Sequence, residues 1–286
     1  MTSHTVTAAE LSAATARFDR EAVWGICRTP GYSMRYAVWG DAPRTLVVVH
    51  GLCDLARSFA MVMGNLLDDF RCVAVELPNG KDDDAVLGIY RHEHYSRDLL
   101  ALLDHLNLDR VDLLGSSFGS TISLRTATLA PDRLNRVVLQ GGFARRPLIR
   151  IERGLARLGR YWPWRMGQLP IRERVMRKLE SPAFVTAPPE PFDFLIECSG
   201  QTPVRAASRR ALILDKLDLR PLLPKVRCPV LMIGGDRDTI VPRRYEAEVE
   251  AGVPDVRRVE FAPCGHYPQY THPTMMADTM REWLLK

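Results

Sequence analysis

The strongest constraint on the fold is a series of short apolar runs that show little of the alternation expected of a half-exposed strand. Such runs suit strands that are buried on both faces, as in a parallel sheet covered by helices. Six of them occur along the chain, at residues 45–50, 72–76, 110–114, 136–140, 229–234 and 256–261. They predict a sheet whose central strands are parallel.

Helical patterns lie between these runs. Leucines recur at three- and four-residue spacing in residues 95–106, and a second pattern over residues 117–130 stops before Pro131. A final helix is expected at residues 273–285. Alternating strands and helices predict right-handed crossovers and a doubly wound sheet, whose ligand sites lie beyond the carboxyl ends of the strands. Every loop that follows a strand is therefore a candidate site.

Two further runs near the start of the chain complete the predicted sheet. Residues 22–27 and 32–38 flank Pro30-Gly31, a turn dipeptide that suits an antiparallel hairpin. The expected fold class is therefore α/β, with a doubly wound, mostly parallel sheet of about eight strands.

Residues 143–222 are far longer than the loops and single helix that an ordinary crossover requires. Helical patterns fill this interval, and the apolar residues that share a helix face are Leu148, Ile151, Leu155 and Leu158, then Ile171, Val175 and Leu179, with a further segment at 204–214. We predict a core of residues 1–142 and 223–286 and a helical cap, or lid, of residues 143–222. The cap holds 16 Lys and Arg against 8 Asp and Glu, a surplus of 8 positive charges. Since the whole chain has a net charge of +5, the rest of it is slightly acidic, and the basic character of the protein lies in the cap.

Composition narrows the cellular setting. No run approaches the roughly 18 apolar residues of a membrane span, and residues 1–20 are polar without the apolar centre of a signal peptide. The six cysteines show neither zinc-ligand spacing nor a paired pattern. We expect a cytoplasmic protein with reduced cysteines.

Residues 115–119 read Gly-Ser-Ser-Phe-Gly and match G-x-S-x-G, with a buried strand before the motif and a helix after it. The glycines Gly115 and Gly119 allow a sharp turn that lifts the middle serine, Ser117, above the sheet. The helix N-terminus that follows offers free N–H groups to an oxyanion. Ser117 is the candidate nucleophile.

A serine hydroxyl is a weak nucleophile and needs a base. Of the seven histidines, His266 lies in a turn-rich loop directly after the last strand, where it can reach the nucleophile. His4 lies in the N-terminal segment, His105 falls within a helix, and His272 sits at a helix start, a usual place for a solvated residue.

The carboxylate that would orient the histidine is expected in the loop after the preceding strand. Asp236 and Asp238 both lie there, and the residues alone leave the choice between them open because either could be a turn aspartate.

Taken together, these motifs resemble the α/β-hydrolase family, and the resemblance covers the chain from about residue 22 to the end. In that family the nucleophile, the acid and the histidine follow one another along the chain, which matches Ser117, Asp238 and His266. The resemblance favours Asp238 over Asp236, because the family's acid precedes a Val-Pro pair by three residues. Residues 264–268 likewise resemble the family's histidine loop.

Residues 50–53, His-Gly-Leu-Cys, resemble the family's oxyanion loop. The resemblance implies that the backbone N–H groups of Leu52 and Phe118 bind the oxyanion. Gly51 would keep the backbone clear of the substrate, and His50 would hold the loop. Phe118 departs from the family's small residue or methionine, so we expect its ring to narrow the acyl pocket.

The resemblance implies a serine hydrolase that needs no metal or cofactor, with a carboxylesterase acting on an ester of a small or medium acid as first choice. Carbon–carbon bond hydrolysis of a dienoic diketone, of meta-cleavage type, and cofactor-free perhydrolysis share this layout. A lidded ligand-binding protein on the same fold is the non-enzyme alternative. The arginines of the cap favour an anionic small-molecule substrate. We expect neither nucleic acid nor a membrane as partner, and a homodimer is left open.

Three further features carry weaker signals. His92 and His94 lie two residues apart and point to different faces of a helix, so no metal site is expected there. Residues 82–84, three aspartates, suggest a solvated loop. The aromatic segment 161–165 in the cap has three readings: a lip over the active site, a membrane-surface contact or simple packing.

Overall fold

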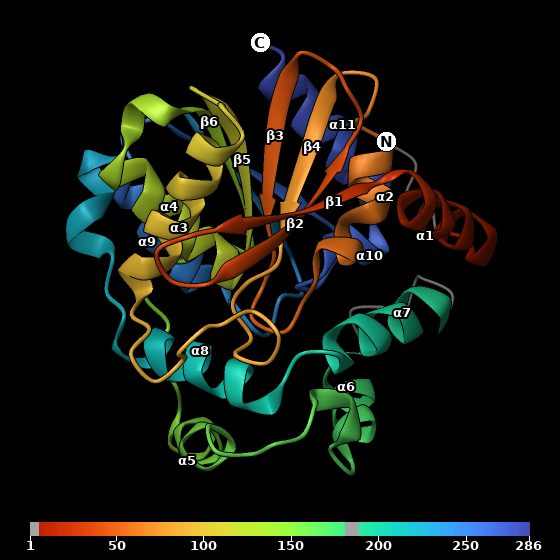
Figure 1. Cartoon of the computed structure of the whole chain (residues 1–286), viewed down its shortest axis with the longest axis vertical. Coiled ribbons are helices and arrows are strands. Elements are labelled where there is room, and N and C mark those ends of the chain that lie inside the picture. The colour runs from red at the N-terminus through yellow and green to blue at the C-terminus, as the bar shows by residue number, and fades with distance from the viewer. Residues whose placement is uncertain (1–5, 181–188) are drawn as a thin grey trace.

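The computed structural model describes residues 6–180 and 189–286 (Figure 1). His4 and residues 181–188 of the expected cap lie outside the described residues. No helix in the described ranges has both the length and the apolar character needed to cross a membrane.

An eight-stranded sheet with the order β1-β2-β4-β3-β5-β6-β7-β8 forms the centre of the molecule. Strands β1 and β2 pair antiparallel with each other, β2 pairs antiparallel with β4, and the other neighbours are parallel. The strands are β1 (Val23–Arg28), β2 (Ser33–Trp39), β3 (Arg44–Val49), β4 (Phe70–Val75), β5 (Val111–Ser116), β6 (Leu134–Gln140), β7 (Val230–Gly235) and β8 (Val256–Phe261). The predicted fold class, including the amino-terminal hairpin, is confirmed.

The central strands are buried on both faces because their alternate residues enter two different cores. In β3, Val47 and Val49 belong to one apolar cluster, whereas Leu46 and Val48 belong to the other. This double burial explains why apolar residues stand at successive positions in β3. The run at 256–261 differs: β8 is an edge strand with exposed or half-exposed residues at all positions but Phe261, so it is not buried on both faces.

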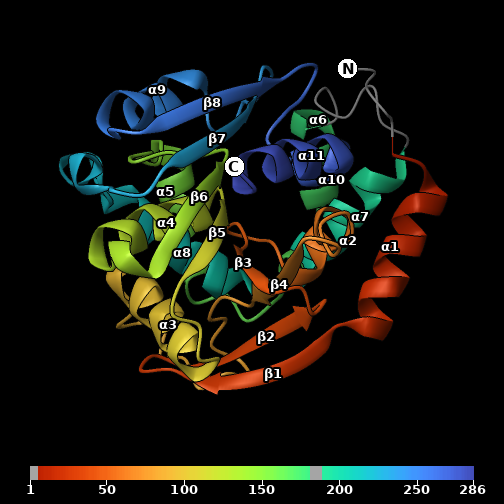
Figure 2. The same ribbon diagram turned by 90° about the horizontal axis from the view of Figure 1, so that it is seen from above.

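Helices cover both faces of the sheet (Figure 2). Residues of α3, α4 and α9 pack into the first core, and residues of α1, α2 and α11 pack into the second. The elements outside the cap interval are α1 (Ala8–Glu21), η1 (Ala56–Phe59), α2 (Ala60–Gly64), α3 (His92–His105), α4 (Phe118–Leu129), η2 (Pro131–Arg133), α9 (Arg243–Gly252), α10 (Pro268–Thr271) and α11 (Pro273–Leu284).

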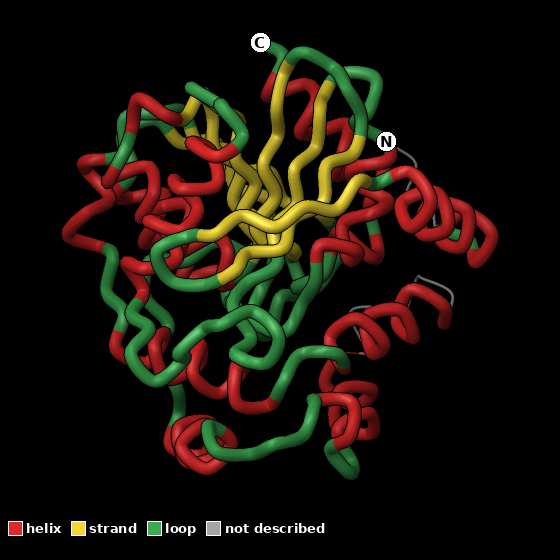
Figure 3. Tube along the Cα trace, in the orientation of Figure 1, coloured by secondary structure: helices red, strands yellow, loops and turns green. Residues whose placement is uncertain are grey.

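The helices between β6 and β7 gather at one end of the sheet, and Figure 3 shows loops at that same end of the strands. These elements are α5 (Arg150–Gly159), η3 (Met166–Gln168), α6 (Arg172–Glu180), α7 (Pro189–Gly200), α8 (Val204–Lys216) and η5 (Arg220–Lys225). The amide of Leu219 donates to the carbonyl of Ala144 at 2.9 Å, so the two ends of the interval lie together. The boundaries 143 and 222 of the cap stay a prediction.

The apolar face of α5 is exposed rather than packed into a core. Such a stripe ordinarily faces the protein interior, yet Ile151, Leu155 and Leu158 are 66 to 71 % exposed. Leu148, just before the helix, is buried.

The amino-terminal segment is a helix that the polar sequence did not reveal. Thr7 and Glu10 form a capping box: the Thr7 side chain accepts from the Glu10 amide at 3.2 Å, and the Glu10 carboxylate accepts from the Thr7 amide at 2.8 Å. Phe18 fixes the helix to the sheet, because its ring is fully buried and packs edge-on against Trp39 at 5.3 Å between centroids.

Replacing Phe18 with alanine tests whether this helix is part of the folding unit. Loss of a fully buried ring should lower the free energy of unfolding by about 3 to 5 kcal/mol. Urea denaturation of Phe18→Ala beside Ser12→Ala, an exposed position on the same helix, provides the comparison. Equal midpoints for the two variants would mean that α1 contributes nothing.

Candidate active site

Ser117 lies at the point where β5 ends and α4 begins, with φ at +50° and ψ at −110°. A residue with a side chain is strained in this conformation, which occurs where the surrounding structure imposes it. Here the Ser117 amide donates to the carbonyl of Gln140 on β6 at 2.8 Å. A Cβ at Gly119 would lie 2.8 Å from the carbonyl oxygen of His50, and a Cβ at Gly115 would lie 2.7 Å from the Gly119 carbonyl carbon. Both glycines are therefore required by close backbone approach.

His266 and Asp238 are joined by a hydrogen bond of 2.6 Å between Nδ1 and Oδ2. The other carboxylate oxygen of Asp238 accepts from the amides of Ile240 and Val241, at 2.9 and 2.7 Å. Both side chains of the pair are at least 96 % buried. The aspartate is thus held by its own loop and fixes the imidazole with Nδ1 as the donor.

Asp236, the other carboxylate candidate, binds a backbone amide and not the imidazole. Its Oδ1 accepts from the amide of Cys264 at 2.8 Å, and the amide of Arg237 donates to the Cys264 carbonyl at 2.9 Å. These two bonds tie the loop after β7 to the loop after β8. The structure therefore places Asp238, and not Asp236, against the imidazole.

The loop after β3 lies beside Ser117. A Cβ at Gly51 would be 3.6 Å from the Ser117 Cβ. The amide of Leu52 makes no hydrogen bond within the described part of the chain. Phe118 is the first residue of α4, where a helix amide has no intrahelical acceptor. Leu52 and Phe118 thus each carry a backbone N–H that has no acceptor among the described residues.

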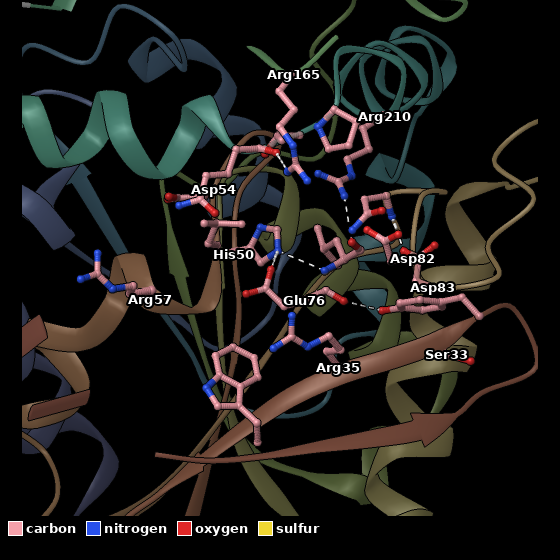
Figure 4. A pocket seen from close by; sticks show the side chains of 18 residues that line it. Ser33, Arg35, His50, Asp54, Arg57, Glu76, Asp82, Asp83, Arg165 and Arg210 are labelled. Carbon is pink, nitrogen blue, oxygen red and sulfur yellow. Dashed lines mark hydrogen bonds and ion pairs between the residues drawn. The ribbon is translucent and has the colours of Figure 1, made fainter. Parts of the chain in front are cut away.

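His50 holds this loop from behind (Figure 4). Its Nδ1 lies 2.8 Å from the Gly51 carbonyl and its Nε2 accepts from the Leu77 amide at 3.1 Å. This pattern requires a proton on Nδ1 and none on Nε2. Figure 4 also shows Glu76 beside the ring, in a polar pocket of about 300 Å³ on the far side of the loop.

Arg210 of α8 was missed by the sequence reasoning, which counted it only among the basic residues of the cap. Its side chain is 2 % exposed. Its guanidinium donates to three carbonyls: Leu52 at 2.6 Å, Leu77 at 3.1 Å and Pro78 at 3.0 Å. A cap helix thereby fixes the peptide that carries one of the two free amides.

Gly141 was also missed. It has φ at +55°, and a Cβ there would lie 2.7 Å from Cε1 and 3.0 Å from Nδ1 of His266. Its only signal in the sequence is its place directly after a buried strand.

Ser117, His266 and the loop at Gly51 line one pocket of about 820 Å³, roofed by apolar side chains of the cap interval. Those side chains include Leu155, Trp162, Trp164, Met166, Ile171 and Val175. Cys53 also lines the pocket, but burial raises the pKa of its thiol to about 11, so it is protonated at neutral pH and a poor rival nucleophile.

Two arginines interrupt the apolar lining. Arg146 donates to the Ile240 carbonyl at 2.7 Å and pairs with Glu152 at 3.1 Å. Arg172 makes no ion pair with any residue in the described ranges; it bonds to the hydroxyl of Ser199, and its Nε is buried without a partner. Burial lowers the pKa of Arg172 because it disfavours the charged guanidinium.

Some expectations about side chains are wrong. The Phe118 ring is fully buried against Tyr95, at 5.1 Å, and does not line the pocket. His272 is 4 % exposed rather than solvated. Asp83 is buried as well, because its carboxylate accepts from the amides of Asn79, Gly80 and Ala85.

Comparisons with known proteins agree with this architecture. A family model described as the alpha/beta hydrolase fold matches residues 44–273. The 3-hydroxybutyrate-oligomer hydrolase of Cupriavidus necator is 26 % identical over 282 residues, covering 88 % of this chain and 93 % of that protein. The 2-hydroxy-6-oxononadienedioate/2-hydroxy-6-oxononatrienedioate hydrolase of Cupriavidus pinatubonensis is 26 % identical over 255 residues, covering 82 % and 84 %. A thermophilic esterase from Thermogutta terrifontis shares the fold, with a TM-score of 0.80, 22 % identity and coverage of 92 % and 98 %.

Replacing Gly141 with alanine should displace the His266 ring, because the new methyl group would overlap it. The proton on Nδ1, held in a short bond to Asp238, should give a low-field proton NMR signal in the wild type that shifts or disappears in Gly141→Ala. Gly154→Ala is the matched control, since a Cβ there meets nothing within 4 Å. An unchanged signal in folded Gly141→Ala would contradict the geometry.

Proposed function

The chain belongs to the α/β-hydrolase fold family and is a hydrolase of that family, and we propose that it is a serine hydrolase that cleaves a carboxylic ester through an acyl-enzyme. One observation carries the proposal. A strained serine and a histidine that is hydrogen-bonded to a buried aspartate at 2.6 Å line the same pocket. Ser117, His266 and Asp238 are the proposed triad.

In the first half-reaction, the Ser117 oxygen attacks the ester carbonyl while His266 Nε2 takes the hydroxyl proton. The carbonyl oxygen becomes an oxyanion between the amides of Leu52 and Phe118. Each such donor is worth about 3 kcal/mol of transition-state stabilisation in enzymes where one has been removed. Asp238 stabilises the imidazolium, which then protonates the departing alcohol as the C–O bond breaks.

In the second half-reaction, water adds to the acyl-enzyme and His266 takes its proton. The tetrahedral intermediate collapses, the bond to the Ser117 oxygen breaks, and the proton returns to that oxygen. The carboxylic acid leaves and the serine is restored. No step needs a metal or cofactor.

The pocket lining supports an acyl group that is apolar along most of its length and carries an anionic group. The walls contributed by the cap interval are mostly apolar. Arg172 is half-buried, its Nε is enclosed without a hydrogen-bond partner, and it makes no ion pair with any described residue, so a substrate carboxylate would give it a direct counter-charge. The cap interval would act as a lid that excludes water and selects the substrate.

Carbon–carbon bond hydrolysis is the second candidate. The relative from Cupriavidus pinatubonensis is named for a hydrolase of dienoic and trienoic dicarboxylates. The half-buried guanidinium of Arg172 in the pocket would suit such a substrate as well as a carboxylated ester. A panel of acyl esters run beside a dienoic ring-fission product separates the two candidates, because turnover of only the latter would favour carbon–carbon cleavage.

Labelling with a fluorophosphonate probe tests the nucleophile. The folded protein should be modified on Ser117, and Ser117→Ala should lose labelling and at least a thousandfold of its p-nitrophenyl ester turnover. Ser120→Ala, one turn along the helix, is the matched control. Full turnover by folded Ser117→Ala would exclude the serine mechanism, and absence of both labelling and turnover in the wild type would favour a lidded binding protein.

Arg172→Gln tests the anionic group. A hydrogen bond to a charged partner is worth about 1.5 to 3 kcal/mol, so kcat/KM should fall roughly ten- to a hundredfold for the half-ester of a dicarboxylic acid, mainly through KM. The corresponding neutral diester should change far less. Arg174→Gln, exposed on the same helix, serves as the control. Equal losses on both esters would remove Arg172 from substrate recognition.

A further inference from the structure

Exposed apolar side chains form a strip on the cap interval. It runs along α5 and into the aromatic segment after it, and its large exposed side chains are Ile149, Ile151, Leu155, Leu158, Tyr161, Trp162 and Trp164. We propose that this apolar strip docks the protein on an anionic lipid bilayer.

The side of α5 opposite the strip packs against α8, and this packing keeps the strip away from α8. Ala156 is buried, and a Cβ at Gly159 would lie 3.3 Å from a side-chain carbon of Val204 on α8. Arg153 is bound to Asp215 of α8 through two bonds of 2.6 and 2.8 Å. The helix is therefore seated by its small and charged residues, and turning the strip inward would break these contacts.

The aromatic residues of the strip suit the boundary between water and lipid. Trp162 and Trp164 stack edge to face at 5.4 Å and are each about two-fifths exposed, while Tyr161 is 71 % exposed. Amphipathic aromatic rings of this kind lie at the headgroup level of bilayers.

A cluster of cations adjoins the strip. Arg91, Arg157, Arg160, Arg209 and Lys216 line a cavity of about 850 Å³. None of the five makes an ion pair within the described part of the chain, and the single carboxylate in the lining, Asp215, is bound by Arg153. We call these five residues the cation cluster.

Arg160 joins the cluster to the strip. Its guanidinium lies over the ring of Tyr161, 4.6 Å from the centroid, and its Nε is buried without a hydrogen-bond partner. The charged and the apolar surfaces are therefore contiguous.

The positive charge beside the apolar strip favours an anionic lipid surface over a second copy of the chain as the partner that covers the strip. A two-fold contact places the same patch on both subunits, so the cation clusters and the basic cap intervals, each with 16 Lys and Arg against 8 Asp and Glu, would be brought together. An anionic bilayer instead takes the apolar strip into its acyl boundary and sets its headgroups against the cation cluster. From the sequence no membrane partner was expected, although a membrane-surface contact was one of three interpretations of the aromatic segment 161–165.

Docking would also place the pocket mouth at the lipid surface. Leu155, Trp162 and Trp164 belong to the apolar strip and also line the pocket that holds Ser117. An amphiphilic ester could pass from the bilayer into the pocket along a continuous apolar wall. This consequence rests on the proposed hydrolase function, whereas docking itself does not.

Vesicle sedimentation with the Ser117→Ala protein tests docking independently of catalysis. We expect binding to phosphatidylglycerol vesicles at low salt, at least tenfold weaker binding to phosphatidylcholine vesicles, and release by 0.5 M salt. Failure of the hydrolase proposal would leave these results unchanged. Equal sedimentation with and without phosphatidylglycerol vesicles would overturn the docking proposal.

Paired variants locate the contact. Ile151→Ser with Leu158→Ser, which lie outside the pocket lining, should reduce vesicle binding at least tenfold, as should Arg157→Gln with Arg209→Gln. The matched controls are Val23→Ser with Leu285→Ser, and Arg227→Gln with Arg257→Gln, exposed positions outside the cap interval. Losses of the same size in the control pairs would contradict docking through this face.

Two further measurements test whether a second copy of the chain or a free anion binds this face instead of a bilayer. Size-exclusion chromatography with light scattering reports the mass: a dimer that Ile151→Ser with Leu158→Ser disperses, combined with no vesicle binding, would make the face a contact between copies. Inorganic phosphate at millimolar concentration should not displace bound vesicles. If phosphate alone raises the melting temperature through Arg157 and Arg209 while vesicles do not bind, the cluster holds a free anion and the proposal fails.

Discussion

The close approach of α4 to the end of β3 is the constraint on which the site depends. Because residue 119 is glycine, the helix start can touch the backbone at Val49 and His50. That contact brings Ser117 beside the loop after β3. Gln140 extends the arrangement: its backbone carbonyl holds the Ser117 amide, and its side chain donates to the His266 carbonyl at 2.7 Å. These contacts position the ends of β5 and β6 and the loops after β3 and β8 against one another.

The electrostatics of the site depend on which charged side chains already have a partner within the protein. Asp238 and Asp236 come from one loop, yet one holds the imidazole and the other holds a backbone amide of the histidine loop. Arg146 is likewise committed, to Glu152 and to the Ile240 carbonyl. Arg172, by contrast, makes no ion pair with any described residue of the pocket. The five residues of the cation cluster likewise make none within the described part of the chain.

Local motifs and sheet topology made much of this predictable. The six apolar runs predicted the parallel strands correctly, although the last of them forms the partly exposed edge strand β8, and Ser117, Asp238 and His266 lie in loops at the carboxyl ends of these strands. Features that depend on packing between distant segments were not predictable. Arg210 looked like any other basic cap residue until its three carbonyl partners were known, and α1 was hidden by a polar sequence whose one decisive residue is Phe18. The Phe118 ring was expected to narrow the acyl pocket, but it is fully buried and packs against Tyr95.

The anchoring of Arg210 has a mechanical consequence. The Arg210 guanidinium is buried and makes no ion pair within the described ranges, so pulling it away from the three carbonyls would leave a charge and three acceptors unsatisfied together. Helix α8 and the Leu52 peptide must therefore travel as one body during small displacements of the cap. A displacement of helix α8 would therefore also move the backbone amide of Leu52, the proposed oxyanion donor.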